Sequence, residues 1–543
     1  MSEQRVDQHL RRLSSLRAER NRHEHVWRQC FDHTYPELGD GLGGNSLTDA
    51  GTAQTKKAEL LDSTGTDAAR LLASSIMSGM TPANQVWFAM DVGEETDEER
   101  RWLDHAAERC WEEIHGSNYD AAKFEGLLQI VNAGWCVLFC DEQDGRLQFE
   151  LWPLGQCFLG QTRSGGPVDM LYRCFQLTAE QAVAAYGEDK LSDKVREDAA
   201  KNPDAKHEFV LCIAPRKVYA AGSRMPQQLP YESLHIEVNG KREVRESGYH
   251  EQPFVAPRWT VLPGSPYAIG PVSNALPTIR QLNALLALES VALARAAAGV
   301  YVAEDDGVLN PRSVRVRGGS VIVANSVDSI KPLPTGADFN VTLSKANEMR
   351  SEIRRLMMAD QLQPQDGPAM TATEVHVRVA LIRQLLGPVY GRFQAEDLAP
   401  TIERVFGLVY RRGRPELGGR PGPVDIDDAP ESLGDTPFRT RYQSPLARAQ
   451  KLEDVTAIER VMGIAGAMAQ AGKPEVLDMI DSEEALRLAA DGLGAPAKVL
   501  RDEKALKAYR DQRAESQNQQ AQAEQQQQIQ TMAAEAAFSR AAA

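Results

Sequence analysis

Two helical stretches in the middle of the chain enclose a short β-rich segment, and this arrangement limits the fold more than any other feature. Residues 274–298 form an Ala- and Leu-rich helical pattern. In the segment that follows, Val314 and Val316 alternate with arginines before a Gly-Gly turn at 318–319. A second helical pattern then carries an apolar face. That face contains Leu343, Ala346, Met349, Ile353, Leu356 and Met357. Surfaces too apolar to stand alone predict a subunit of an assembly.

The first half of the sequence predicts a mixed α+β region. Helical patterns cover residues 3–31, 64–80 and 98–115. A Gly-, Ser- and Thr-rich loop is expected over 39–55. Between residues 136 and 262 the apolar period changes to two, which predicts strands. One alternating run, 234–238, precedes Asn239-Gly240, a dipeptide typical of a tight hairpin turn.

Beyond residue 360 the sequence predicts helices with several breaks. A Pro- and Gln-rich loop at 361–368 precedes a long helix whose apolar residues are spaced as in a coiled-coil seam. These residues are Val375, Val379, Ile382, Leu386, Val389 and Phe393. Pro388 lies inside this run and predicts a kink or break. After a Gly- and Pro-rich connector at 411–437, further helices are expected, and the Gln-rich end after residue 510 is either helical or disordered.

The charge balance excludes one class of function. The chain has 543 residues, with 61 Lys and Arg against 76 Asp and Glu, and a formal charge of −15. Its pI is near 5.3. A protein that holds nucleic acid tightly over its whole surface needs the opposite sign of charge. A simple basic DNA binder is therefore excluded.

Membrane and disulfide-bonded classes are also disfavoured. The first residues are polar and lack the apolar stretch of a signal peptide. The most apolar run, 282–302, contains Glu289 and Arg295, so we expect a helix in solution. Seven cysteines without a CxxC pair predict small buried side chains with free thiols, in a reducing cytoplasm.

Familiar catalytic motifs fail on inspection. Residues 39–44 match GxGxxG, but no strand precedes them and no βαβ unit surrounds them. The stretch 466–473 has five residues between its glycines, and Pro474 stands where a magnesium-binding hydroxyl is required. His23-Glu24-His25 lacks a second histidine four positions on. The sequence therefore predicts no catalytic residue, no metal site and no cofactor.

Several short motifs occur in an order typical of one known family. They are 61–65, 72–74, Met80-Thr81-Pro82, Trp87-Phe88, Pro257-Arg258-Trp259, 266–271, 370–375 and 442–446. Each alone is weak, but their order and spacing over about residues 5 to 505 are fairly specific. Together they resemble the head-to-tail connector, or portal, proteins of short-tailed double-stranded DNA phages.

This resemblance implies a mainly helical α+β subunit of portal type, which forms a dodecameric ring around a central channel. The regions it implies are an N-terminal α+β wing (1–270), a first stem helix (271–299), a β-rich clip (300–340), a second stem helix (341–360), a tunnel loop (361–370), a long kinked helix with more of the wing (371–440), a helical crown (441–500) and a helical or disordered Gln-rich tail (501–543).

The resemblance also implies a function without catalysis. The ring would occupy one capsid vertex of the virion, after assembly in the host cytoplasm, and act as the channel for genome packaging and ejection. The partners it implies are other copies of the chain, the terminase large subunit, tail adaptor proteins, the major capsid and scaffolding proteins, and double-stranded DNA that passes without sequence specificity. No membrane partner is expected.

Three groups of residues are candidate sites under this resemblance. The cations of the second stem helix either touch DNA phosphates weakly or form salt bridges between subunits: Lys345, Arg350, Arg354 and Arg355. The clip arginines either dock terminase and tail proteins or are simply solvated: Arg312, Arg315 and Arg317. The tunnel loop has the composition of a mobile element: Gln361, Gln363, Gln365, Asp366 and Gly367.

Other oligomeric virion proteins remain as alternatives. A tail adaptor or an internal ejection protein would also be a non-enzymatic subunit, although an ejection protein is expected to have longer amphipathic, membrane-active helices. A packaging ATPase is disfavoured because the phosphate loop is absent.

Overall fold

The computed structural model describes residues 2–39, 42, 50–92, 96–220, 223–298, 301–303, 330–332, 339–359, 387, 389–433, 439–442, 445–470, 480–493, 506–507 and 509–513. The chain forms two compact units. The larger contains Met1–Trp87 with Glu108–Ile426, and the smaller contains Phe88–Ala107 with Asp427–Ala543. Helices and sheets are both present, and helices predominate, as the sequence predicts.

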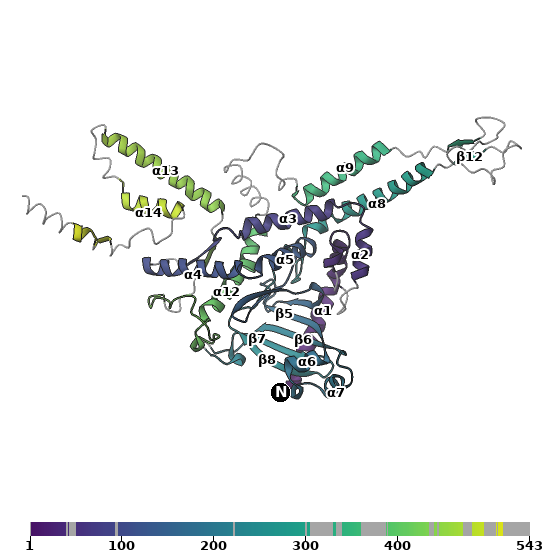
Figure 1. Ribbon diagram of the computed structural model, residues 1–543, viewed down its shortest axis with the longest axis horizontal. Coiled ribbons are helices and arrows are strands. Elements are labelled where there is room, and N and C mark those ends of the chain that lie inside the picture. The colour runs from purple at the N-terminus through teal and green to yellow at the C-terminus, as the bar shows by residue number, and fades with distance from the viewer. Residues whose placement is uncertain are drawn as a thin grey trace, which may run out of the picture. The chain divides into compact units, whose positions relative to one another are not determined.

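The larger unit is built on a five-stranded antiparallel sheet. Its strands in spatial order are β4 (Cys157–Gly160), β5 (Met170–Thr178), β6 (Lys206–Pro215), β7 (Tyr231–Glu237) and β8 (Arg242–Tyr249). The first helix, α1 (Ser2–Asp32), crosses one face of this sheet (Figure 1), where Val6 and Leu13 share a core with Tyr172 and Cys212. Two short helices, α6 (Ala179–Tyr186) and α7 (Asp193–Lys201), connect β5 to β6. The helix predicted over 3–31 is confirmed.

The hairpin predicted at Asn239-Gly240 is present, but its turn differs from the expected one. Four residues, 238–241, connect β7 to β8. The N–H of Lys241 donates to the carbonyl of Val238 over 3.3 Å, and Lys241 has a φ of +44°. A two-residue turn would need a positive φ at both Asn239 and Gly240. The dipeptide therefore marks the position of the hairpin but not its geometry.

A smaller sheet lies beside the first helix in the same unit. Its strands in spatial order are β3 (Arg146–Leu151), β2 (Leu138–Gln143) and β9 (Phe254–Val255). The ring of Trp27 from α1 packs 5.4 Å from Trp135 and 5.2 Å from Tyr267, measured between centroids. The Tyr267 hydroxyl accepts the N–H of Leu159 in β4 over 3.1 Å. This aromatic core therefore joins the first helix to both sheets. A two-stranded ribbon follows: β10 (Thr260–Val261) and β11 (Ala268–Ile269).

A set of helices covers the remaining side of the larger unit. They are α2 (Ala50–Ala58), α3 (Thr64–Met80), α5 (Tyr119–Ala133), α8 (Pro271–Ala298) and α9 (Phe339–Leu356). Helix α3 packs against α5, α8 and α9. The predicted helices over 64–80 and 274–298 are confirmed, whereas α2 begins inside the expected loop 39–55. Short helical turns occupy Pro36–Leu38, Leu154–Gln156, Glu188–Lys190, Pro226–Gln228 and Pro415–Leu417.

The smaller unit is mostly helical. Strand β1 (Phe88–Asp91) pairs antiparallel with β14 (Arg439–Tyr442). Helix α13 (Pro445–Gln470) packs against α14 (Ser482–Leu493), in agreement with helices predicted on either side of a break near residue 473. The boundary between the units falls within α4 (Asp97–His115), which confirms the helix predicted over 98–115.

Two predictions from the sequence concern the cysteines and the apolar helices. All seven cysteines are buried with free thiols, which confirms the prediction of small buried side chains. Burial raises the pKa of the Cys30 thiol to about 12. Among the described helices, none combines the length and the apolar character that crossing a bilayer requires.

A π-helical turn (Gln394–Leu398) leads directly into helix α12 (Ala399–Arg411). Pro400 has no N–H to donate to the carbonyl four residues back, so regular α-helical bonding is interrupted at this point. The kink predicted at Pro388 lies outside the described residues, as does most of the long helix before it.

Buried ion pairs connect the π turn and α12 to the first half of the chain. In the π turn, Asp397 pairs with Lys123 of α5, and both side chains are nearly inaccessible to solvent. The residue before it, Glu396, accepts a hydrogen bond from Arg258, with 3.0 Å between Nε of Arg258 and Oε2 of Glu396. Because adjacent residues 396 and 397 contact different elements, the turn is held from two directions.

Three arginines of α12 and the loop after it continue these attachments. Arg404 and Arg411 share the carboxylate of Glu251, with nitrogen–oxygen distances of 3.2 and 2.7 Å to Oε2. Burial disfavours the charged form of Glu251, but the hydrogen bond and charge of Arg411 hold its pKa below the ordinary value. Arg412 is nearly buried and contacts three carboxylates. They belong to Glu113, Glu142 and Asp425.

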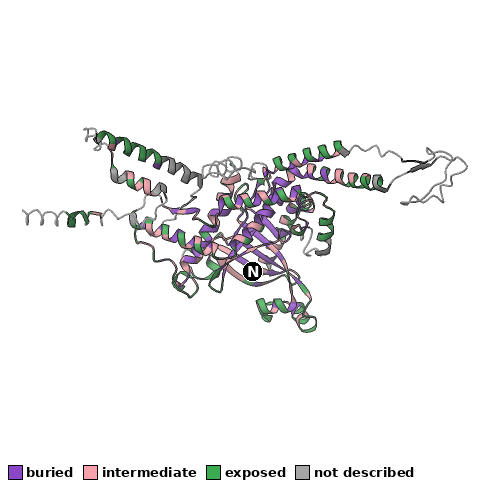
Figure 2. Cartoon of the chain, turned by 45° about the horizontal axis from the view of Figure 1, so that its top comes forward, coloured by how far each residue is buried: buried purple, intermediate pink, exposed green. Residues whose placement is uncertain are grey.

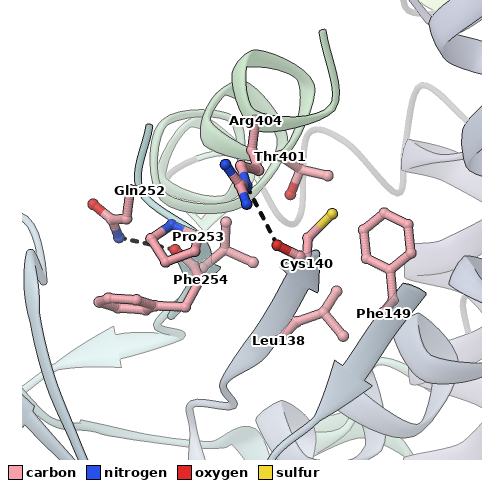
Figure 3. Close-up of a pocket in the computed structure, with 9 residues that line it drawn as sticks. Leu138, Cys140, Phe149, Gln252, Pro253, Phe254, Thr401 and Arg404 are labelled. Atoms are coloured by element: carbon pink, nitrogen blue, oxygen red, sulfur yellow. Dashed lines mark hydrogen bonds between the residues drawn. The ribbon is translucent and has the colours of Figure 1, made fainter. Parts of the chain in front are cut away.

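A small cavity lies where α12 covers the smaller sheet (Figure 3). It is lined by Leu138, Cys140, Phe149, Gln252, Pro253, Phe254, Val255, Thr401 and Arg404. Arg404 donates to the carbonyl of Cys140 over 3.3 Å at its edge. The space holds about one water molecule, so we assign no ligand to it.

The Lys123–Asp397 pair gives a stability prediction. Lys123→Met leaves the Asp397 carboxylate buried without its partner, and we expect the free energy of unfolding to fall by about 3–5 kcal/mol in urea denaturation. Lys123→Met combined with Asp397→Leu removes both charges and should recover most of this loss. Lys201→Met is the matched control, because its pair with Glu197 is exposed and is worth about 0–1 kcal/mol. Equal losses for Lys123→Met and Lys201→Met would contradict the prediction.

Candidate functional site

The candidate site is the pair of long helices α8 and α9, which pack against each other in the larger unit. Helix α8 starts at Pro271, directly after Gly270. A Cβ on Gly270 would lie 2.3 Å from the carbonyl oxygen of Val131, so only glycine lets the chain approach α5 this closely. Val272 and Ala275, in the first turns of α8, are fully buried. These contacts fix where the helix pair leaves the core.

Away from the core, much of both helices is exposed (Figure 2). The exposed residues there include large apolar side chains. Leu288 of α8 is 70% exposed and Val341 of α9 is 64% exposed. The other members of this set are Val291, Leu293 and Leu343. We call these five residues the distal apolar set. Side chains of this size, gathered on one helix pair, indicate a surface that another protein covers.

The apolar face predicted for the second helix is only partly buried. Ala346, Met349, Ile353 and Met357 are buried. Leu343, which belongs to the same predicted face, is 53% exposed. Leu343 lies nearer the start of α9 (Phe339–Leu356) than the four buried residues do.

The four cations predicted on this helix have different surroundings. Lys345 pairs with Glu348 on the same helix over 2.9 Å. Arg350 donates from Nε to Oδ2 of Asp62 over 2.8 Å and from Nη1 to Asn347 over 3.0 Å. Arg354 and Arg355 are exposed on the last turns of α9.

Asp62, the partner of Arg350, also fixes the start of α3. Its Oδ1 accepts the N–H of Thr64, the first residue of that helix, over 2.9 Å. Burial alone would raise the pKa of Asp62, but the hydrogen bonds from Thr64 and Arg350 lower it below the ordinary value. Arg350 is therefore engaged within its own chain, and sequence reasoning did not find this partner.

The two other predicted groups lie outside the described residues. They comprise the clip arginines Arg312, Arg315 and Arg317, and the tunnel-loop residues Gln361, Gln363, Gln365, Asp366 and Gly367. What the structure describes near the first group is a short antiparallel pair, β12 (Tyr301–Ala303) with β13 (Ile330–Pro332). This pair follows α8 and precedes α9, so the helix–β–helix order is confirmed for the described residues.

Nearly all of the chain is similar to one family of known proteins. Residues 6–500 match the model of the family described as bacteriophage head to tail connecting protein. The portal protein of Salmonella phage epsilon15 is 26% identical, over 95% of this chain and 92% of that protein. The probable portal protein of Bordetella phage BPP-1 is 28% identical, over 94% of this chain and 91% of that protein.

Solved structures show a weaker likeness. A chain in the virion of a native gene transfer agent particle matches with a TM-score of 0.34 and 12% identity, over 67% of this chain and 84% of that one. A chain in the neck of an empty particle of the same kind matches with a TM-score of 0.33 and 13% identity, over 82% and 95%. These scores are too low to support an argument about the fold. The family model, in contrast, spans nearly all of the sequence, and the protein therefore belongs to the bacteriophage head to tail connecting proteins.

Proposed function

We propose that this chain is the portal subunit of a phage, a structural component of the virion at one capsid vertex. The observation that carries the proposal is the family match over residues 6–500. Two proteins named as portal or probable portal proteins align over more than nine-tenths of this chain. Portal subunits are structural, so no catalytic role is proposed.

The distal apolar set supports assembly into a ring. Leu288 and Val341 are mostly exposed in the single chain. Covering them with a neighbouring copy would remove apolar surface from water at about 25 cal/mol per Å². A head-to-tail contact that repeats around an axis forms a ring when its rotation closes on the first copy. We propose a dodecameric ring, in which α8 and α9 are the stem helices, the first half of the chain forms the wing, and α13 and α14 belong to the crown.

The cations of α9 divide into two classes under this proposal. Lys345 and Arg350 already pair with carboxylates of the same chain, so little of their charge is left for a phosphate. Arg354 and Arg355 are exposed, and we assign the weak DNA contacts of the channel to them. A chain with a net charge of −15 favours passage of DNA over tight binding, because each neutralised phosphate adds affinity.

The remaining partners belong to the same proposal. Terminase large subunit and tail adaptor proteins would dock on the clip, through Arg312, Arg315 and Arg317. The tunnel loop at 361–370 would contact translocating DNA. The wing would face the major capsid and scaffolding proteins, and assembly would take place in the host cytoplasm.

The ring gives a test of the proposed function. Native mass spectrometry and negative-stain imaging of the purified chain should show a closed ring near twelve subunits with a central hole. Leu288→Glu and Val341→Glu each place a charge in the proposed subunit contact, so both should abolish the ring without lowering the melting temperature of the subunit.

The control for the ring test is Val218→Glu. Val218 is 87% exposed but lies in the loop between β6 and β7, so this variant should assemble normally. A monomeric wild type would refute the proposed function. Rings formed equally well by the Leu288→Glu variant would refute the role of the distal apolar set.

The division of the cations gives a second test. In a DNA packaging assay run over a range of ionic strengths, Arg354→Ala should change the salt dependence, because it removes an exposed charge from the channel. Lys345→Ala is the matched control on the same helix and should change it less, since Lys345 is paired with Glu348. Packaging by Arg354→Ala that equals wild type at every ionic strength would refute the assignment.

A further inference from the structure

Three potential metal donors lie together where α1 crosses the five-stranded sheet. They are His9 of α1, Cys212 of β6 and Glu232 of β7. One nitrogen, one sulfur and one oxygen atom from these residues all lie within 4.8 Å of one another. We propose that this cluster binds Zn²⁺ or a chemically similar divalent cation. The proposal concerns the wing alone and does not depend on the proposed portal function.

The register of the sheet brings two of the donors to one face. Cys212 stands opposite Leu234 in the antiparallel pair of β6 and β7. Glu232 is two residues from Leu234, so its side chain points to the same face as that of Leu234 and Cys212. Helix α1 covers this face and supplies His9. Two consecutive strands and a helix from the start of the chain therefore fix the three donors.

Cys212 lies nearest to Nδ1 of the His9 ring and Glu232 to Nε2, so binding of one ion by all three residues requires the imidazole or the carboxylate to rotate. The Sγ of Cys212 lies 3.4 Å from Nδ1 of His9. Tetrahedral zinc bonds of about 2.0 Å to nitrogen and 2.3 Å to sulfur separate two such ligands by roughly 3.5 Å. The Tyr172 hydroxyl lies 2.8 Å from the same nitrogen. It can complete the coordination or donate to a water molecule that does.

The two oxygens of Glu232 have separate roles. Its Oε2 accepts from Arg5 over 3.0 Å, whereas Oε1 faces His9, 3.9 Å from Nε2. Arg5 also binds Glu246 over 2.9 Å, so its positive charge is balanced by a second carboxylate. The Oε1 of Glu232 therefore remains available to a cation.

Charge balance requires the thiol to lose its proton on binding. The S–H bond of Cys212 breaks, the proton leaves to solvent, and a sulfur–metal bond forms. Thiolate and carboxylate together then neutralise the two positive charges of the ion. Without this proton release, Arg5 and Arg12, whose positive charges both act on His9 and Cys212, would oppose the uncompensated charge of the ion.

The same residues do not form a catalytic site, because a substrate cannot reach them. Cysteine and histidine at this distance can form a nucleophile and its base. Cys212, however, is fully buried, so no substrate can reach its sulfur. An ion needs only a narrow entry, and the side chains of His9 and Glu232 keep 11% and 16% of their surfaces exposed. The geometry thus suits a structural ion that fastens the start of α1 to β6 and β7.

Cobalt provides a spectroscopic probe of the site. The purified full-length chain, treated with a chelator and then titrated with Co²⁺, should develop a thiolate-to-cobalt charge-transfer band that saturates near one ion per chain. Zn²⁺ should displace this band. Cys212→Ser and His9→Gln should each abolish it. Cys174→Ser is the matched control, because Cys174 is buried in the same core on β5, and it should retain the band.

Thermal unfolding keeps the test decisive if one variant folds poorly. Zn²⁺ should raise the melting temperature of the wild type and of Cys174→Ser, but not that of His9→Gln or Glu232→Gln. A wild type without a cobalt band would overturn the proposal, as would a band that Cys212→Ser or His9→Gln retains in full. Ring assembly is measured separately, so failure here leaves the portal proposal intact.

Discussion

The attachment of residues 389–414 to the first half of the chain depends on charges paired out of water. Lys123 with Asp397, Arg258 with Glu396 and Arg412 with Glu113 and Glu142 join segments more than a hundred residues apart. Breaking such a pair is costly because the remaining charge stays buried. Apolar packing would tolerate small shifts of the segment, whereas these pairs require defined geometry. The π turn and α12 are therefore held in one position within the larger unit.

The fold was predictable wherever one side of an element faces water. Helices α1, α3 and α8 carry apolar residues at helical spacing, and their bounds agree closely with the predicted ones. Helix α5 gave no such signal, because residues 126–133 are all buried and leave no polar face. The turn at 238–241 shows a different limit: Asn-Gly marks a reversal, but the strand register decides which residue takes the positive φ.

The candidate site was predictable in position but not in its pairing. The sequence places Lys345, Arg350, Arg354 and Arg355 on one helix, and α9 confirms that they share it. It does not reveal that Asp62, far away in the chain, binds Arg350, because such a contact depends on how α3 packs against α9. The arginines of α12 were missed for the same reason, although the run Arg411-Arg412 with Arg414 was visible as a cluster of cations.

The burial of α8 and α9 separates two stages in the life of the protein. Their first contacts, at Val272 and Ala275 and at Ile353 and Met357, are made within one chain, so folding of the larger unit does not wait for a neighbour. In the proposed ring, the distal apolar set is covered only when the subunit meets another copy, a step whose rate rises with concentration. A newly made subunit is thus folded but still exposes the distal apolar set. If it meets other copies slowly in a crowded cell, other proteins can bind this surface first. Timely synthesis of many copies is then part of correct assembly.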